Sequence, residues 1–267
     1  YAFLESQYTI AVNYTPWLRN LTSDVFLGSV IYANRIDERS AWATSLTYFS
    51  LGSIELRQTG DPNEQVIIEN PNELAIDGSY SMRLSESFSM AVGLRYIRSD
   101  FALRVADSDI NTVNTFSVDI AGFFQTQEEN YGTFNGRWRG GFNISNIGPR
   151  VSFTDSGQKN FIPTNLRIGG GFDFILDEYN TISANIELNK LLVPTPPLRD
   201  SNGDIASGQT DDVGFFKGIF QSFGDAPGGF KEELKEFTWA IGGEYLYDDA
   251  FAVRAGFYNE NDLKSAR

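Results

Sequence analysis

Apolar and polar residues alternate with a period of two along most of the chain. The clearest case is the stretch 74–98, in which leucine, isoleucine, glycine, tyrosine and methionine occupy every second position of residues 74–84. The triplet Ser85-Glu86-Ser87 interrupts the pattern, which then resumes up to residue 98. Two alternating arms of about ten residues around a short polar turn predict a β-hairpin.

The same alternation recurs along the whole chain and predicts about eleven strands. Their ranges are 8–14, 25–33, 41–57, 74–84, 88–98, 114–125, 137–145, 166–176, 181–190, 237–247 and 251–258. In the range 41–57 the apolar positions change parity near Ser50, which predicts a bulge or the edge of a membrane-embedded part. Most of the arms have the length that a tilted strand needs to cross a bilayer, about 9 to 11 residues.

Polar and charged residues recur on the second face of these strands. They are Asp77, Arg83, Arg95, Asp119, Arg139, Asn143, Arg167, Asp173, Asn185, Glu187, Glu244 and Arg254. A dry core would not tolerate these groups unpaired, whereas a lumen filled with water or with a polar plug would. The pattern therefore predicts an all-β fold, a transmembrane antiparallel β-barrel of the outer-membrane type. A soluble sheet with these residues facing water is the alternative.

Aromatic residues and connection lengths agree with a barrel. Aromatic residues gather at strand ends, as interfacial girdles do: Tyr8, Tyr14, Phe88, Tyr96, Tyr245, Tyr247, Phe257 and Tyr258. Short turns at 85–87, 177–179 and 248–250 alternate with long connections at 58–71, 147–163 and 191–236. In bacterial barrels the short turns are periplasmic and the long loops extracellular. We expect residues 1–267 to form a single barrel domain with a long outer loop at 191–236.

Composition narrows the possible functions. The 267 residues include no cysteine and no histidine, and the formal net charge is −14. These absences exclude a disulfide framework, thiolate catalysis and Ser-His-Asp triads, and the acidic balance disfavours nucleic acid as a partner. No apolar run approaches the 18 residues of a transmembrane helix. We find no catalytic constellation and expect no enzymatic activity, no cofactor and no metal site.

The long connection 191–236 contains a candidate interaction segment. Asp211 or Asp212 could cap a helix whose apolar residues fall on one stripe. Such a stripe on an outer loop could cover the barrel mouth, enter the outer leaflet or bind a partner. In another outer loop, Trp17 beside Arg19 suggests either a protein interface or a membrane anchor. The candidate partner-binding residues are Trp17, Arg19, Phe215, Phe216, Ile219, Phe220 and Phe223.

Six short motifs resemble those of the PorV family, a component of the type IX secretion system of Bacteroidota. They are Asn13-Tyr14-Thr15-Pro16-Trp17-Leu18-Arg19, Tyr48-Phe49-Ser50-Leu51-Gly52, Arg95-Tyr96-Ile97-Arg98-Ser99-Asp100, Phe142-Asn143-Ile144-Ser145-Asn146-Ile147-Gly148, Asn189-Lys190-Leu191-Leu192-Val193-Pro194 and Tyr258-Asn259-Glu260-Asn261. The resemblance runs from about residue 13 to 261 and implies an outer-membrane barrel of fourteen strands, of the kind shared with the FadL fatty-acid transporters. In this family an N-terminal plug segment would precede the sequence and about three strands would follow it, so we expect a chain truncated at both ends.

The resemblance also implies a function and its partners. A PorV-like protein binds secreted cargo through the C-terminal signal domain, docks at the large translocon barrel and passes cargo to the surface sortase complex. Its surroundings are outer-membrane lipid, with the long loops extracellular. The alternative is a FadL-like transporter of hydrophobic small molecules, against which the charged inner-face residues argue. A hydrolase acting on lipid A ranks last, because a chain without histidine offers no recognisable mechanism for it.

Overall fold

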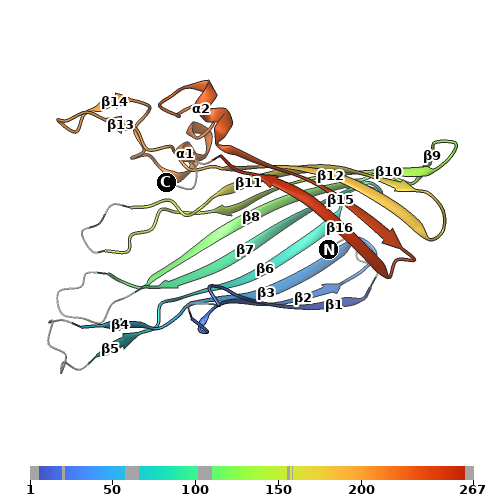
Figure 1. The fold of residues 1–267 in the computed structure, drawn as a ribbon, viewed down its shortest axis with the longest axis horizontal. Helices are drawn as coiled ribbons and strands as arrows, with labels where there is room; N and C mark the ends of the chain where they lie inside the picture. Colours follow the sequence, from blue (N-terminus) through green and yellow to red (C-terminus); the bar gives the residue numbers. More distant parts are fainter. Residues whose placement is uncertain are drawn as a thin grey trace. The chain divides into compact units, whose positions relative to one another are not determined.

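The computed structural model describes residues 6–19, 22–57, 66–101, 110–154, 157 and 159–261, and the chain is all-β (Figure 1). The long strands are β1 (Tyr8–Pro16), β2 (Val25–Arg35), β3 (Ser40–Leu51), β6 (Asn72–Arg83), β7 (Phe88–Asp100), β8 (Val113–Gln125), β10 (Asn135–Ile147), β11 (Asn165–Ile175), β12 (Asn180–Leu191), β15 (Phe237–Tyr247) and β16 (Phe251–Asn259). The short elements are β4 (Ile54–Leu56), β5 (Ile67–Glu69), β9 (Glu129–Asn130), β13 (Leu198–Arg199), β14 (Ile205–Ser207), α1 (Phe215–Gln221) and α2 (Phe230–Lys235). In the part of the chain that is described, no helix is both long enough and apolar enough to span a membrane.

The long strands follow one another in a single sheet. Its order is β1-β2-β3-β6-β7-β8-β10-β11-β12-β15-β16, and β9 pairs with β10 beside this path. The pairs with a defined register, such as β1 with β2 and β11 with β12, are antiparallel. The eleven alternating segments thus correspond one for one to the eleven strands of the path, which confirms the predicted all-β antiparallel fold class. The reason is local, because a period of two places each strand's apolar side chains on one face.

The chain divides into two compact units. The first comprises residues 1–82, 92–118 and 148–162, and the second comprises residues 83–91, 119–147 and 163–267. In the first unit β1, β2, β3 and β6 pair in chain order, and β4 pairs with β5 as a separate hairpin. In the second unit β10, β11, β12, β15 and β16 pair in chain order. There, α1, α2, β13 and β14 gather at one end of the strands, and β9 lies at the other (Figure 1).

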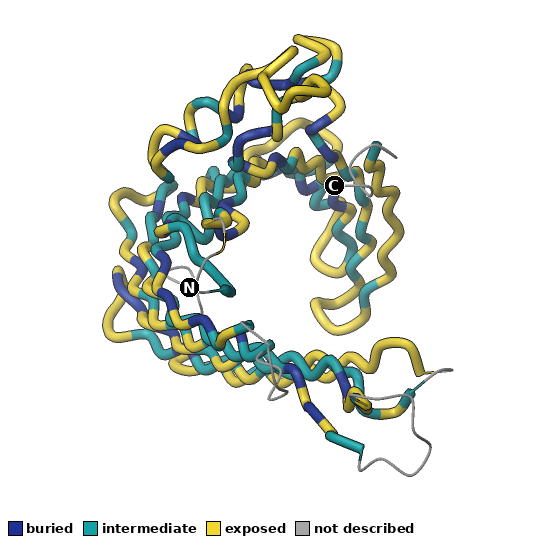
Figure 2. Tube along the Cα trace, turned by 90° about the vertical axis from the view of Figure 1, so that its left-hand side faces the viewer, coloured by how far each residue is buried: buried dark blue, intermediate teal, exposed yellow. Residues whose placement is uncertain are grey.

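One face of each unit is apolar and exposed. In the first unit this face carries Tyr8, Ile10, Val12, Tyr14, Val30, Trp42, Leu46, Ile76 and Tyr80. In the second it carries Trp138, Ile168, Ile182, Ile186, Leu188, Ile241, Tyr245, Val253 and Phe257. Buried positions are scattered along the trace among exposed and half-buried ones (Figure 2). An exposed apolar face of this extent is typical of a β-sheet that faces lipid.

Two predictions were wrong, one about the extent of a strand and one about an aromatic residue. The segment 41–57 is not one strand, because β3 ends at Leu51 and Gly52 turns the chain with a φ of +84° before β4 begins. The register of β3 against β2 and β6 is unbroken up to that end, so the change of parity marks the strand end and no bulge. Tyr258 is not part of an outer aromatic girdle, since it shares the polar face of β16 with Arg254.

The short turns form as predicted. Leu84 N donates to Phe88 O at 2.8 Å, and Leu176 N donates to Asn180 O at 2.9 Å. In the second of these turns Asp177 accepts hydrogen bonds from the backbone N–H of Tyr179 and from Asn180, which lowers the pKa of the Asp177 carboxyl. The long connections carry the short elements: β5 lies in 58–71, and β13, β14, α1 and α2 lie in 191–236. Residues 58–65 of the first lie outside the described residues.

Candidate functional site

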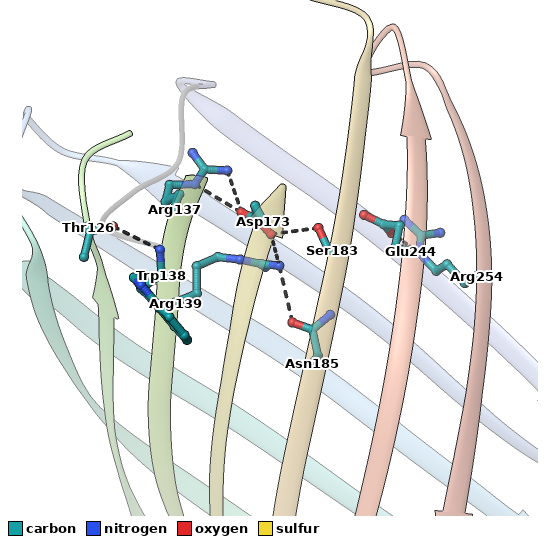
Figure 3. A network of polar contacts seen from close by, with 9 residues as sticks. All are labelled: Thr126, Arg137, Trp138, Arg139, Asp173, Ser183, Asn185, Glu244 and Arg254. Carbon is teal, nitrogen blue, oxygen red and sulfur yellow. Dashed lines mark hydrogen bonds and ion pairs between the residues drawn. The ribbon is translucent and has the colours of Figure 1, made fainter. Parts of the chain in front are cut away.

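The polar face of the second unit is organised around one carboxylate. Asp173 on β11 is only 2% exposed and lies between β10 and β12. It accepts hydrogen bonds from Arg137 Nε at 3.1 Å, from Arg139 Nη2 at 2.5 Å and from Ser183 Oγ at 2.7 Å (Figure 3). Arg139 Nη2 also donates to Asn185 on β12 at 3.3 Å. The alternating pattern placed these residues on one face, and the sheet register brings their side chains together.

Charges are also paired elsewhere on the polar faces. Glu244 on β15 pairs with Arg254 on β16, its register partner (Figure 3). In the first unit Arg95 Nε lies 2.5 Å from Asp77 Oδ1, and Ser45 Oγ donates to the other oxygen of that carboxylate at 2.8 Å. Paired charges of this kind suit a face in contact with water or polar protein, and they fix the strand register more than they suggest catalysis. Among the described residues no cluster of three acidic, histidine or cysteine side chains could hold a metal ion.

A buried lysine anchors the segment 192–236 to the sheet. Lys190 is fully buried at the end of β12, and its Nζ lies 2.7 Å from Glu233 Oε1 and 2.8 Å from Glu236 Oε2. The rings of Phe223 and Phe237 also lie within 6 Å of this ammonium group. If α2 moved away, the buried ammonium group and both carboxylates would lose their compensating charges. The lysine therefore holds α2 against the end of β12.

A second layer of hydrogen bonds joins the rest of the segment to this pair. Thr195 Oγ1 donates to Glu236 Oε1 at 2.6 Å, and Thr195 N donates to Asp225 Oδ2 at 3.0 Å. Gln221 Nε2, at the end of α1, reaches the same Asp225 oxygen at 3.3 Å. Burial raises the pKa of the Asp225 carboxyl, and the nearby carboxylates of Glu233 and Glu236 raise it further. No donor among the described residues reaches Asp225 Oδ1.

The sequence offered one signal for this anchor, which our prediction missed. Lys190 occupies a position of β12 that shares the apolar face of Ile186 and Leu188. A charged residue in an apolar register either reaches water or finds a buried partner. The partners lie more than forty residues further along the chain, in α2 and just after it. The local alternation of residues around Lys190 therefore could not identify these two carboxylates as its partners.

The predicted apolar stripe forms a helix but divides in two. Phe215 and Ile219 are half-buried, whereas Phe216 and Phe220 are 62% and 77% exposed. The predicted cap was wrong, because α1 begins after Gly214 and no side chain caps it. The exposed apolar residues of the two helices, together with Phe223 just after α1, are what we call the outer aromatic surface: Phe216, Phe220, Phe223, Phe230 and Leu234.

Two residues of this surface were absent from the prediction. Phe230 is 75% exposed and Leu234 is 54% exposed, and both lie on α2. Their spacing of four residues on a helical turn was the available signal. The other predicted site residues, Trp17 and Arg19, lie in the connection after β1 in the first unit, and both are exposed. Trp17 N donates to Val25 O at 2.9 Å, which closes this connection.

Comparison with known proteins identifies the family. The model of the family described as type IX secretion system protein PorV matches residues 1–198. A search of curated proteins gives no match. The matched region contains β1 to β12 with the contacts of Asp77 and Asp173, and it ends before α1. Since it covers well over half of the sequence, the chain belongs to the PorV family of type IX secretion system proteins.

Proposed function

We propose that this chain is a non-enzymatic outer-membrane component of the type IX secretion system. It binds secreted cargo through the C-terminal signal domain, docks at the translocon barrel and passes cargo to the surface sortase complex. Family membership supports the system, and the exposed apolar sheet faces support a barrel in the outer membrane. The long connections, with the segment 192–236 among them, lie on the extracellular side in this proposal.

The observation that carries the proposal is the outer aromatic surface on an anchored segment. Large aromatic side chains that are exposed on a fixed backbone are the residues that dominate protein interfaces. The buried pair of Lys190 with Glu233 and Glu236 holds α2 in place before any partner arrives. Preorganisation of this kind lowers the entropy cost of binding, so affinity can come from a small patch.

Substitution of the surface tests the proposal. The double variant Phe216→Asp and Phe220→Asp should abolish co-purification with a cargo C-terminal signal domain. The barrel itself should keep its heat-modifiable migration on gels, because both side chains are largely exposed and lie outside the strands. A matched control places aspartate at Leu198 and Ile205, two exposed apolar residues of the β13–β14 hairpin in the same segment. Undiminished cargo binding by the first variant would contradict the proposal.

One observation favours a second candidate, the transport of a hydrophobic small molecule. The polar face of the first unit has a cavity of about 560 Å³ whose lining is mostly apolar. Trp17, Leu27, Phe49 and Ile97 contribute to it, beside the charge pair of Asp77. If this is the main function, mass spectrometry of the purified protein should find a bound acyl chain, and Leu27→Trp should expel it while cargo binding is unaffected.

A further inference from the structure

The exposed side of α1 and α2 carries positive charge as well as aromatic residues. Lys217 on α1 and Lys231 and Lys235 on α2 are all exposed. No described residue forms a hydrogen bond or an ion pair with any of these three ammonium groups. The chain as a whole has a formal net charge of −14, so this group of cations differs in sign from the average surface.

Helical spacing places the lysines of α2 directly beside its apolar residues. Phe230 and Leu234 are four residues apart and form one row along the helix. Lys231 and Lys235 form the next row, about 100° around the helix axis. A partner that covers the apolar row therefore meets the two ammonium groups along its border.

The acidic residues of α2 are turned to the opposite side, where the protein itself uses them. Glu233 is buried, and its Oε1 lies 2.7 Å from Lys190 Nζ. Glu232 is half-buried, and its Oε2 accepts a hydrogen bond from Gly228 N at 2.7 Å. The negative charges of this helix are thus bound internally, whereas its positive charges remain for a partner.

The shorter helix α1 repeats the arrangement. Phe216 and Phe220 are four residues apart and both exposed, and Lys217 directly follows the first of them. On the other side of the helix Gly218 is buried and Ile219 half-buried. Both helices of the segment 192–236 therefore combine exposed apolar side chains with an adjacent lysine row.

A protein surface suits this combination better than a lipid surface. A helix that lies on a membrane buries one apolar stripe in the lipid and turns its polar side to water. In α1 and α2 the side away from the exposed rows is already occupied, since Ile219 packs inward and Glu233 pairs with Lys190. The exposed side must provide both apolar and charged contacts, as the apolar core and the polar rim of a protein interface do.

We propose that the outer aromatic surface binds a protein whose own apolar patch is bordered by carboxylates. Apolar side chains of the partner cover Phe216, Phe220 and Phe230, and its Asp and Glu side chains reach the lysine rim, which we define as Lys217, Lys231 and Lys235. Charges at such a rim orient the partner and exclude surfaces of the wrong sign. This inference rests on the proposed function in taking the partner to be a secreted protein, and it adds the chemistry by which that partner is recognised.

A pair of probe peptides tests the lysine rim directly. Both are fluorescein-labelled helical peptides with one row of leucines, which glutamates flank in the first peptide and glutamines in its twin. Titrated against the protein purified from outer membranes in mild detergent, the glutamate peptide should bind about tenfold more tightly, because three exposed charge contacts contribute a factor of about two each. Salt at about 1 M should remove most of this difference, since it shortens the screening length to about 3 Å.

The triple variant Lys217→Gln, Lys231→Gln and Lys235→Gln should bind both peptides as the unchanged protein binds the glutamine peptide. Lys159→Gln, at an exposed lysine outside the segment 192–236, is the control and should keep the preference. Unchanged hydrogen exchange of α2 confirms that the helices of the triple variant are in place. Equal binding of the twins, no binding of either at millimolar concentration, or a preference that survives in the triple variant overturns the inference.

A second measurement separates a protein partner from membrane lipid. Hydrogen exchange of α1 and α2 is compared in nanodiscs of zwitterionic lipid with and without added anionic phospholipid. Without a peptide the two should give equal exchange. Protection that anionic lipid alone confers, and that the triple variant loses, assigns the lysine rim to lipid phosphates and overturns the inference.

The proposed function is measured separately with a cargo C-terminal signal domain. If that domain binds through Phe216 and Phe220, and the triple variant binds the domain and both peptides as the unchanged protein does, the inference about the lysine rim fails alone. If the domain does not bind, but the preference for the glutamate peptide is found and the triple variant loses it, the proposed function fails alone.

Discussion

Replacing Lys190 with methionine should release the segment 192–236 without unfolding the strands. The substitution removes a fully buried ammonium group that lies 2.7 Å and 2.8 Å from two carboxylates. The carboxylates of Glu233 and Glu236 are 7% and 10% exposed, so water screens them little. Removal of one partner from a buried pair costs about 3–5 kcal/mol, because the remaining charge is left uncompensated. That free energy corresponds to a rise in local opening of roughly a hundredfold to several thousandfold.

Hydrogen exchange of α2 and limited proteolysis of the segment measure this opening. Lys190→Met should speed hydrogen exchange in α2 and make the segment 192–236 open to proteolytic cleavage. The protein's heat-modifiable migration on gels should stay the same. Lys231→Met, a matched change at an exposed lysine of α2, should leave the segment protected. Adding Glu233→Gln and Glu236→Gln to Lys190→Met should restore part of the protection, since no buried charge then remains unpaired. Protection of α2 in Lys190→Met equal to that of the unchanged protein would refute the anchoring role of the charge pair.

Two further predictions concern Asp225 and Gly52. The pKa of Asp225 is raised in the folded segment, so the segment is most stable below the ordinary value of 3.8 and loses stability as pH rises through the raised pKa. Hydrogen exchange of α2, corrected for intrinsic rates, should therefore show less protection at pH 8 than near pH 3.8, and Asp225→Asn should remove most of that difference; a slope that survives the substitution assigns it to another group. Gly52→Val should lower the free energy of unfolding by about 1–2 kcal/mol in urea titration, because φ is +84° and a Cβ would lie 3.0 Å from Asp24 Oδ1. Ser53→Val, at the next residue, is its control, and an equal loss in both variants would show that the backbone at Gly52 is not the cause.

In the proposed function, the polar face of the sheet and the segment after β12 have different roles. The charge-paired polar face holds the strands in register, as the contacts of Asp173 show. The outer aromatic surface lies in the segment after β12, where the backbone is free of the sheet's hydrogen-bond pattern. Binding residues on loops above a rigid scaffold are a common arrangement, because loops can vary without loss of the fold.

The sequence by itself determined the strands and the faces on which their side chains lie. A period of two is a local property of the backbone, so the parity of Asp77 and Arg95 or of Glu244 and Arg254 was enough to assign them to one polar face. The pattern signalled the strand end near Gly52 only as a change of parity, whereas the positive φ of Gly52 and the separate pairing of β4 with β5 show that β3 ends there.

Only the tertiary structure decided which of these residues meet and which stay exposed. The pairing of Lys190 with Glu233 and Glu236 joins residues more than forty positions apart, and no spacing rule connects them. The same packing divides the predicted helical stripe, because Phe215 faces inward while Phe220 remains in solvent. Burial and contact across long sequence separations depend on the packing of the whole segment, and local alternation contains no information about it.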